Sequence, residues 1–362
     1  MIIAISITLF FIVLRFTVTV FNFVSNPKLT RVNRPYTDLV SILIPARNEQ
    51  HNILNLLQSI QMQDYENYEV IVYDDLSTDD TYTICEAFAK THLRIKVIKG
   101  EELPAGWTGK NYACYQLAKQ AKGKYFLFID ADTTVNNNLI NSAVYRMQLH
   151  KLSLLSLFCN QQMLTFGEQT TVPMLHYMLL NLLPLRLVYL SKNASIATAC
   201  GQFMLFDAAT YRQKQWHLQV KEKVVEDAEI MKLVKAKALN GEVLLANGMI
   251  SCRMYKSYTE AVSGFSKNLF AVFNYNALSL LLYILIVIGG PMIVIMTLNF
   301  NLIFFMSGLI LLTRVMVSLS SGQNAWYNVV LHPLQMFNLV IIAFSSIQRH
   351  LAKTNLWKGR RV

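Results

Sequence analysis

Long apolar runs occupy both ends of the chain, and the first of them predicts a transmembrane anchor. Residues 1–24 are almost uninterrupted apolar sequence apart from Arg15. At about 1.5 Å of rise per residue, such a helix is long enough to cross a bilayer core of about 30 Å. The segment lacks the basic start and small-residue cleavage site of a signal peptide. Lys28, Arg31 and Arg34 follow it, so the positive-inside rule places the next segment in the cytoplasm.

Apolar runs return near the C-terminal end, where they predict further membrane segments over residues 278–350. Leu278 to Leu298 and Leu302 to Leu319 are long enough to span, and Val329 to Ile347 is a third candidate. Three spans would place the basic tail 351–362 outside the cell. Two spans and a re-entrant or interfacial third segment keep the tail cytoplasmic. We therefore predict a multi-pass protein of the cell membrane with the second arrangement.

A different pattern fills the middle of the chain, where short apolar runs alternate with amphipathic stretches. The runs predict strands at 40–44, 70–73, 95–98 and 125–129, and the stretches between them predict helices, as at 53–60 and 112–121. Such alternation indicates an α/β domain with a parallel sheet covered on both faces, which we place at residues 36–270. Ligands bind at the carboxyl ends of the strands in sheets of this kind.

The rhythm becomes less regular after Leu152. Further strands are predicted at 153–158 and 202–206, and a helix at 227–239. The apolar run from Met174 to Leu190 is broken by Pro184 and Arg186, which makes it a poor membrane span. A helix at the membrane surface, a helix lining an acceptor channel and a buried core helix all fit it.

Composition and charge narrow the class of protein. The chain is 53% hydrophobic and only 15% charged, so part of it must face lipid. Its formal charge of +11 does not come from a basic run interleaved with stacking aromatics, which argues against a nucleic-acid partner. An anionic membrane surface or a phosphate-bearing substrate fits the charge better. The five cysteines form no C-x-x-C pair, so we expect reduced thiols.

Two carboxylates follow the predicted strand 125–129 directly. Asp130 and Asp132 stand two positions apart, where the strand breaks into a loop and both can turn to one side. Carboxylate oxygens bind hard divalent cations such as Mg²⁺ and Mn²⁺, which keep positions open for substrate phosphates. The pair therefore predicts a site for Mg²⁺ or Mn²⁺ and a diphosphate.

Acidic residues also follow the strand 70–73. A capping role at the start of the next helix accounts for Ser77, Thr78 and Asp79. It does not account for Asp74 and Asp75. A carboxylate at a strand end can accept a hydrogen bond from the N–H of a nucleobase. We expect this role for Asp74 or Asp75.

A helix opens at Gly109 and Lys110, and its first amide groups can face a diphosphate together with the lysine ammonium. The segment is not a Walker A loop, because neither its glycine spacing nor a Ser or Thr after Lys110 fits. Glu226 and Asp227 begin another predicted helix. They either stabilise its N-terminus or supply the general base that takes a proton from an acceptor hydroxyl. A single displacement with such a base would invert the anomeric stereochemistry.

Together these segments resemble glycosyltransferase family 2, whose domain has the GT-A nucleotide-diphospho-sugar transferase fold. The matching motifs are PARNE at 45–49, DDLSTD at 74–79, GKNYAC at 109–114, DAD at 130–132 and ED at 226–227. The resemblance implies that Asp132 holds the metal and that Asp227 is the base. It also implies a nucleotide pocket formed by Pro45, Arg47, Glu49, and Asp74 or Asp75.

A closer likeness is to membrane transferases of the 4,4'-diaponeurosporenoate glycosyltransferase type. It rests on GWTGKNYACYQLA, RMYKSYTEAVSGFSKNLF, LHPLQMF and WKGR. It implies UDP-glucose as donor and an apolar isoprenoid acceptor, such as a carotenoid acid. The Q-x-x-R-W motif of processive relatives is missing, which favours transfer of a single sugar. Lys267 stands in the matching region, where it either contacts the leaving diphosphate or only flanks the membrane.

Other functions remain open on the sequence. An enzyme of the same fold could act on a polyprenyl phosphate, a hopanoid or other glycolipid, or an exopolysaccharide glycan. A non-catalytic membrane scaffold could keep a degenerate nucleotide-sugar domain. A two-metal phosphohydrolase is disfavoured, because the sequence offers no further His or Asp cluster for a second ion.

Overall fold

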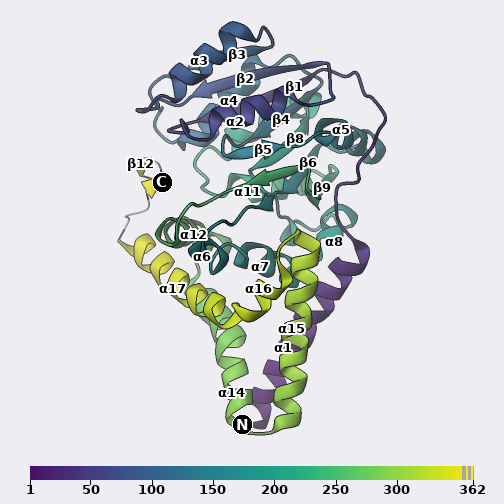
Figure 1. Ribbon diagram of the computed structural model, residues 1–362, viewed down its shortest axis with the longest axis vertical. Helices are drawn as coiled ribbons and strands as arrows, with labels where there is room; N and C mark the ends of the chain where they lie inside the picture. The colour runs from purple at the N-terminus through teal and green to yellow at the C-terminus, as the bar shows by residue number, and fades with distance from the viewer. Residues whose placement is uncertain (353–355, 358–359, 362) are drawn as a thin grey trace. The chain divides into compact units, whose positions relative to one another are not determined.

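The computed structural model describes residues 1–352, 356–357 and 360–361, and these fall into two compact units. The sheet unit comprises Pro27–Asn160 and Arg186–Arg253. The helical unit comprises Met1–Asn26, Gln161–Leu185 and Met254–Val362. Figure 1 labels many of the helices and strands of both units.

A seven-stranded sheet forms the centre of the sheet unit, with strand order β3-β2-β1-β4-β8-β6-β9. Its strands are β1 (Val40–Ala46), β2 (Tyr68–Asp74), β3 (Ile95–Lys99), β4 (Tyr125–Ile129), β6 (Leu154–Phe158), β8 (Phe203–Asp207) and β9 (Gly241–Leu245). The first four strands pair in parallel, as the sequence pattern predicts. Strand β8 runs antiparallel to both of its neighbours, so the complete sheet is mixed.

Helices pack against this sheet and enclose its apolar core. They are α2 (Ile53–Gln61), α3 (Thr81–Thr91), α4 (Gly109–Gln120), α5 (Leu139–His150), α8 (Leu185–Leu190), α9 (Ala208–Lys214), α10 (Trp216–Gln219) and α11 (Glu226–Ala236), with a 3-10 turn η1 (Ala194–Ile196). Every residue of β4, β6 and β9 is buried, which is typical of strands covered on both faces. Three short strands, β5 (Thr133–Val135), β7 (Asn160–Gln161) and β10 (Ile250–Cys252), lie outside the main sheet, and β5 pairs antiparallel with β10.

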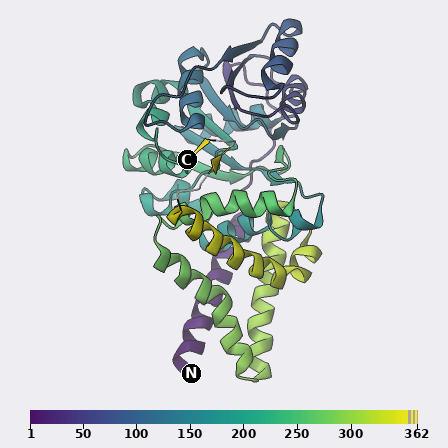
Figure 2. The ribbon, with the colours of Figure 1, turned by 90° about the vertical axis from the view of Figure 1, so that its left-hand side faces the viewer.

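The helical unit contains the apolar segments from both ends of the chain. Its elements are α1 (Ile2–Ser25), α6 (Phe166–Gln169), α7 (Met174–Leu182), α12 (Tyr258–Val272), α13 (Ala277–Ile284), a π-helical turn η2 (Leu285–Gly289), α14 (Gly290–Met296), α15 (Phe300–Ser321), α16 (Ala325–Val330) and α17 (His332–Leu351). Figure 2 shows α12 and α17 packed side by side. Two short strands, β11 (Leu356–Trp357) and β12 (Arg360–Arg361), pair near the C-terminal end.

Three helical segments in the described part of the chain are long and apolar enough to cross a membrane. They are Ile2–Ser25, Ala277–Met296 and Phe300–Ser321. These segments coincide with the predicted anchor and with the first two predicted C-terminal spans. The third predicted segment, 329–347, falls mainly in α17, which is not among the three. The number of complete spans and their orientation stay predictions, and Lys353 and Lys358 of the predicted tail lie outside the described residues.

The interrupted apolar run from Met174 to Leu190 forms two helices with a break at Leu183 and Pro184. Within the helical unit, α7 packs against α1 and α15 and buries Tyr177 and Asn181 among other side chains. This burial favours the interpretation of α7 as a packed helix. The predicted domain 36–270 thus contributes residues 161–185 and 254–270 to the helical unit, because their apolar faces pack there.

Candidate active site

The strand register brings the predicted acidic segments to one edge of the sheet. Ala46 at the end of β1 pairs with Asp74 at the end of β2, and β4 lies on the other side of β1. Asp130, which follows β4, is therefore at the same edge as Asp74 and two strands away. The usual spacing between strands makes that separation about 10 Å.

At the ends of β1 and β2, backbone and side-chain hydrogen bonds tie two loops together. The guanidinium Nη1 of Arg47 donates to the carbonyls of Asp75, at 2.5 Å, and Leu76, at 2.9 Å. The amide of Glu49 donates to Thr81 Oγ1 at 2.7 Å. Arg47 and Glu49 therefore shape this corner of the sheet unit, and Pro45 is the penultimate residue of β1.

Asp74 and Asp75 are both buried, at 2% exposure each. Asp74 Oδ2 accepts a hydrogen bond from the amide of Ser77 at 3.3 Å, whereas its Oδ1 has no hydrogen-bond partner among the described residues. A buried carboxylate oxygen without a partner is costly unless a ligand satisfies it. This oxygen fits the predicted role as acceptor from a nucleobase N–H.

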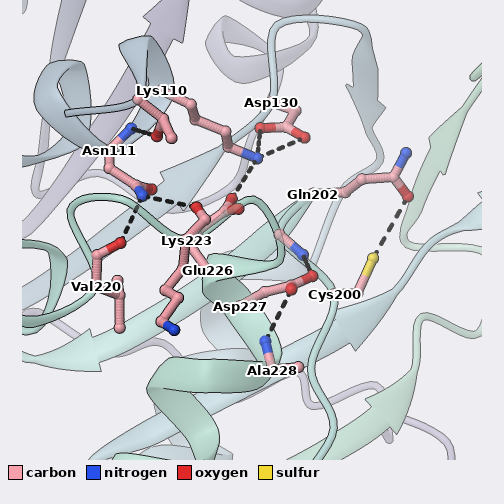
Figure 3. Close-up of polar contacts among 12 residues, drawn as sticks. Lys110, Asn111, Asp130, Cys200, Gln202, Val220, Lys223, Glu226, Asp227 and Ala228 are labelled. Carbon is pink, nitrogen blue, oxygen red and sulfur yellow. Dashed lines mark hydrogen bonds and ion pairs between the residues drawn. The ribbon is translucent and has the colours of Figure 1, made fainter. Parts of the chain in front are cut away.

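A second group of charges surrounds Lys110, whose ammonium bridges the end of β4 and the start of α11 (Figure 3). Its Nζ lies 2.8 Å from Asp130 Oδ1 and 3.1 Å from Glu226 Oε1. Burial alone would lower the pKa of Lys110, but the carboxylates of Asp130 and Glu226 raise it well above its usual range. Lys110 is therefore a permanent cation at neutral pH, and one that two carboxylates compensate.

Asp227 stands beside this cluster with both carboxylate oxygens held by backbone amides. Its Oδ2 accepts from the amide of Gly201 at 2.8 Å, and its Oδ1 from the amide of Ala228 at 2.7 Å. Removal from water, followed by the nearby charge of Glu226, raises the pKa of Asp227 to about 7, against the opposing effect of these hydrogen bonds and of Lys110. A carboxyl group poised near neutrality can serve as a general base.

The sequence analysis did not identify two residues of the site, Gly201 and Asn111. Because β8 runs antiparallel to β4, Gly201 and Gln202 lie beside the end of β4. The amide of Asp130 donates to the carbonyl oxygen of Gln202 at 3.3 Å. A Cβ atom on Gly201 would stand 2.9 Å from Lys110 Nζ and 3.3 Å from Glu226 Oε1. A side chain at position 201 would therefore displace the Lys110 ammonium, and only the antiparallel pairing reveals this contact.

The second missed residue is Asn111, which is fully buried on α4. Its Nδ2 donates to the carbonyl oxygens of Val220 at 2.8 Å, Lys223 at 3.0 Å and Lys221 at 3.3 Å (Figure 3). These carbonyls belong to the loop that leads into α11. A polar residue on the otherwise apolar face of this helix is a sequence signal for a buried Asn111, but it does not identify the carbonyl groups that Asn111 contacts.

Asp130 and Asp132 offer the donor chemistry that a divalent cation needs. Both carboxylates lie close enough to two buried thiols to raise their pKa values. The pKa of Cys159 is raised by burial and then by the charges of Cys200, Asp132 and Asp130. The pKa of Cys252 is raised by burial and then by Asp132. No group of three or more His, Cys, Asp or Glu side chains within the described residues could hold a metal alone. One or two carboxylates completed by substrate phosphates and waters are the usual surroundings of Mg²⁺, so this donor set fits.

Lys267 lies in α12 of the helical unit, whereas the site residues described above belong to the sheet unit. Its predicted contact with a leaving diphosphate stays a prediction.

Comparison with known proteins gives one family match and several partial relatives. Residues 41–212 match the family model for glycosyl transferase family 2. The glycosyltransferase GlyG of Streptococcus pneumoniae is 30% identical over 31% of this chain and 36% of its own length. The 4,4'-diaponeurosporenoate glycosyltransferase of Staphylococcus haemolyticus is 26% identical over 64% of this chain and 61% of its own. The chain thus matches less than two thirds of the length of either relative.

A solved structure extends the likeness of fold to nearly the whole chain. The mannosyltransferase PcManGT from Pyrobaculum calidifontis, in complex with GDP-Man and Mn²⁺, superposes with a TM-score of 0.57. The match covers 97% of this chain and 99% of the other at 14% identity. At that identity the comparison establishes the fold alone. GDP-Man and Mn²⁺ are ligands of the Pyrobaculum calidifontis protein and are not inferred for this chain.

Proposed function

We propose that this protein transfers a single sugar to a lipid-like acceptor, because residues 41–212 match the model of glycosyl transferase family 2 and the chain has the predicted GT-A fold. The proposed reaction is inverting and uses Mg²⁺ or Mn²⁺. Its proposed donor is UDP-glucose and its proposed acceptor an isoprenoid such as a carotenoid acid. The name of the Staphylococcus haemolyticus relative supports that acceptor, and the three helices apolar enough to span a membrane support its lipid character.

The observation that carries the proposal is the cluster of Lys110, Asp130, Glu226 and Asp227 at the carboxyl edge of the sheet. A nucleoside diphosphate needs cations, and the acceptor needs a base close to them. Lys110, beside Asp130, offers a cation for the diphosphate. Asp227, with its pKa raised to about 7, offers the base for the acceptor. A bound metal at Asp132 and Asp130 would neutralise the charge that develops on the departing diphosphate.

In the proposed reaction, the acceptor oxygen attacks the anomeric carbon from the face opposite the nucleoside diphosphate. Asp227 accepts the proton of a hydroxyl acceptor while the bond to the diphosphate breaks and inversion follows. The remaining side chains orient the donor: Asp74 or Asp75 accepts from the base N–H, and Lys110 holds the phosphates. Lys110 needs no large movement to meet a phosphate, since its ammonium already faces the carboxylates at that edge.

The test uses the full-length protein in detergent or nanodiscs with UDP-glucose, UDP-GlcNAc and GDP-mannose as donors. Each donor is combined with 4,4'-diaponeurosporenoic acid, a hydroxylated hopanoid or a polyprenyl phosphate, and products are identified by mass. We expect one added hexose on the carotenoid acid, with UDP-glucose and added Mg²⁺ or Mn²⁺. Transfer of a sugar to another acceptor would change the proposed acceptor and leave the proposed transferase activity intact.

Two variants separate catalysis from folding. Asp132→Asn should abolish the metal-dependent gain in rate without changing the melting temperature. Asp80→Asn is the matched control, because Asp80 is exposed and its side chain makes no capping hydrogen bond to α3. Neither transfer nor donor hydrolysis with any donor in the intact protein would support the non-catalytic scaffold instead.

A further inference from the structure

The helical unit contains two arginines in the middle of apolar helices. Arg15 lies in α1, ten residues before its end at Ser25, and Arg314 lies in α15, seven residues before its end at Ser321. At about 1.5 Å of rise per residue, these positions are about 15 Å and about 10 Å inside their helices. Both helices are apolar enough to cross a membrane. Charged side chains at such positions are costly and mark functional sites by default.

Both guanidinium groups converge on one aromatic ring. Arg314 Cζ stands 3.6 Å from the centroid of the Tyr177 ring, and Arg15 Cζ stands 5.2 Å from it. Arg314 is 1% exposed. Cation–π contacts with one tyrosine stabilise each cation modestly, but they do not neutralise the charge of two neighbouring cations.

The described residues of the helical unit provide no acidic partner for this pair. The helical unit contains two acidic residues in its entire sequence, Glu168 and Glu260. Each accepts hydrogen bonds from backbone amides at the start of its own helix, α6 or α12. Among the described residues, Arg15 and Arg314 form no ion pair, since every pair found involves other residues. Two positive charges thus stand in apolar surroundings without a counter-charge.

Hydrogen-bond donors around the pair are also left without acceptors. Arg15 Nε donates to Asn181 Oδ1 at 3.3 Å, and Arg314 Nε donates to His332 Nδ1 at 2.7 Å. Beyond these bonds, four buried polar atoms of this cluster have no hydrogen-bond partner among the described residues: Nη2 of Arg15, Nη2 of Arg314, Nδ2 of Asn181 and the hydroxyl of Tyr283. Tyr283 lies within electrostatic range of both guanidinium groups. All four can donate a hydrogen bond.

Among the described residues, this cluster differs from the other buried polar side chains of the helical unit in that its unpaired atoms are donors, whereas the unpaired amide oxygens of Asn268 and Gln335 are acceptors. Asn328 donates to Ser318 Oγ and Gln323 Oε1, both at 2.9 Å, and accepts from Gln335 at 3.1 Å. An anion with several oxygen atoms would satisfy the cluster's buried unpaired donors. It would also neutralise the excess positive charge around which they lie.

We propose that Arg15, Arg314, Asn181 and Tyr283 form a binding site for the oxyanion of an anionic lipid, with Tyr177 as its floor. A phosphate or carboxylate would accept from both guanidinium forks and neutralise the pair, while the acyl or isoprenoid chain lies against the apolar helices. The proposal rests on the helical unit alone and requires no catalysis by the sheet unit.

The test measures binding of dioleoyl phosphatidic acid to the full-length protein in detergent. Dioleoylglycerol, which has the same chains without the phosphate, and inorganic phosphate are the comparison ligands. We expect saturable binding and a raised melting temperature with phosphatidic acid only. Equal binding of dioleoylglycerol would overturn the proposal, and binding of inorganic phosphate with the same affinity would overturn its lipid part.

Three variants locate the binding. Arg15→Gln and Arg314→Gln should each weaken it about tenfold or more, as expected for lost charge-assisted hydrogen bonds. Arg349→Gln is the matched control: Arg349 lies in the same unit and donates to Ser263 Oγ at 2.8 Å, outside the cluster. An equal loss in Arg349→Gln would show non-specific attraction to basic residues and overturn the site.

Asn181→Asp keeps the test decisive even where removal of an arginine impairs folding. The new carboxylate would stand where Asn181 Oδ1 already accepts from Arg15, so it supplies the missing counter-charge internally. We expect this variant to melt at a higher temperature without lipid and to bind phosphatidic acid at least about tenfold more weakly. Unchanged lipid affinity in this variant would refute the proposal.

Discussion

Asp227 shows at the scale of one residue how burial sets the chemistry of the candidate site. Its folded pKa of about 7 lies above the usual value of 3.8. With a hydroxyl acceptor we expect the transfer rate to rise as pH increases through about 7, because only the ionised carboxylate accepts a proton. Asp227→Asn should lower that rate about 10²- to 10⁴-fold. A carboxylate acceptor is already ionised, so its transfer should fall far less.

The same shift predicts a dependence of stability on pH. The folded state binds the Asp227 proton more tightly than the unfolded state, so its contribution is present at acidic pH and is lost as pH rises through about 7. Between the two pKa values the melting temperature of the wild type should therefore decline, and Asp227→Asn should flatten that decline. Parallel melting curves of both proteins against pH would contradict the assignment.

Gly201 tests whether the position of the Lys110 ammonium matters for transfer. In Gly201→Ala the new Cβ would stand 2.9 Å from Lys110 Nζ, which must move away from the carboxylates. The fold should persist because the end of a lysine side chain is flexible. We expect the transfer rate to fall roughly ten- to hundredfold with little change in melting temperature. Gly308→Ala is the control, since a Cβ there meets nothing within 4 Å, and equal effects of both variants would refute the explanation.

At the scale of elements, Asn111 couples α4 to the loop before α11. Asn111→Leu removes a side-chain donor from three carbonyl groups, of which those of Val220 and Lys221 keep a backbone donor, and we expect the free energy of unfolding to drop by about 1–3 kcal/mol. Amides at 220–228 should exchange with solvent faster, and transfer should slow because Glu226 begins the helix that follows. Asn67→Leu is the control, because Asn67 is exposed and makes a single bond to Thr37 O. Unchanged exchange at 220–228 would show that α11 is held elsewhere.

The strands from β1 to β4 were predictable because their signals are local. Continuous apolar runs such as 125–129 and the polar residues after them mark both a buried strand and its functional end, and the observed β4 has the predicted bounds. The direction of β8 was not predictable in this way, since a strand's run of apolar residues is the same in either orientation. The contacts of Gly201 and Asn111 depend on elements about 90 to 110 residues away, so no local pattern reveals them.

At the scale of the whole molecule, the sequence predicts an anchor, a domain and further membrane segments in linear order. The structure instead assembles the helical unit from three separate stretches of chain. The middle stretch joins it because the run around α7 is apolar and Pro184 ends its helix early. Pro184 is visible in the sequence, but the partner that accommodates the break is not.

That partner is Asn22 of α1, and it supplies the last test. An early helix end leaves carbonyl groups without intrahelical donors. Asn22 Nδ2 donates to the carbonyls of Leu180 and Leu183, both at 2.8 Å, and its Oδ1 accepts from the amide of Leu185 at 2.9 Å. Asn22→Leu would leave all three groups unpaired in apolar surroundings, at a cost of roughly 2–4 kcal/mol.

We expect that cost to appear in the helical unit. In hydrogen exchange of the full-length Asn22→Leu protein, amides of α1 and α7 should exchange faster than in the wild type, while those of β1, β2 and β4 keep their rates. Thr17→Val is the control in the same helix, because Thr17 is exposed and bonds to the carbonyl of Val13 one turn earlier. If the strands lose protection together with α7, the two compact units unfold as one cooperative body, because local damage then spreads through the whole chain.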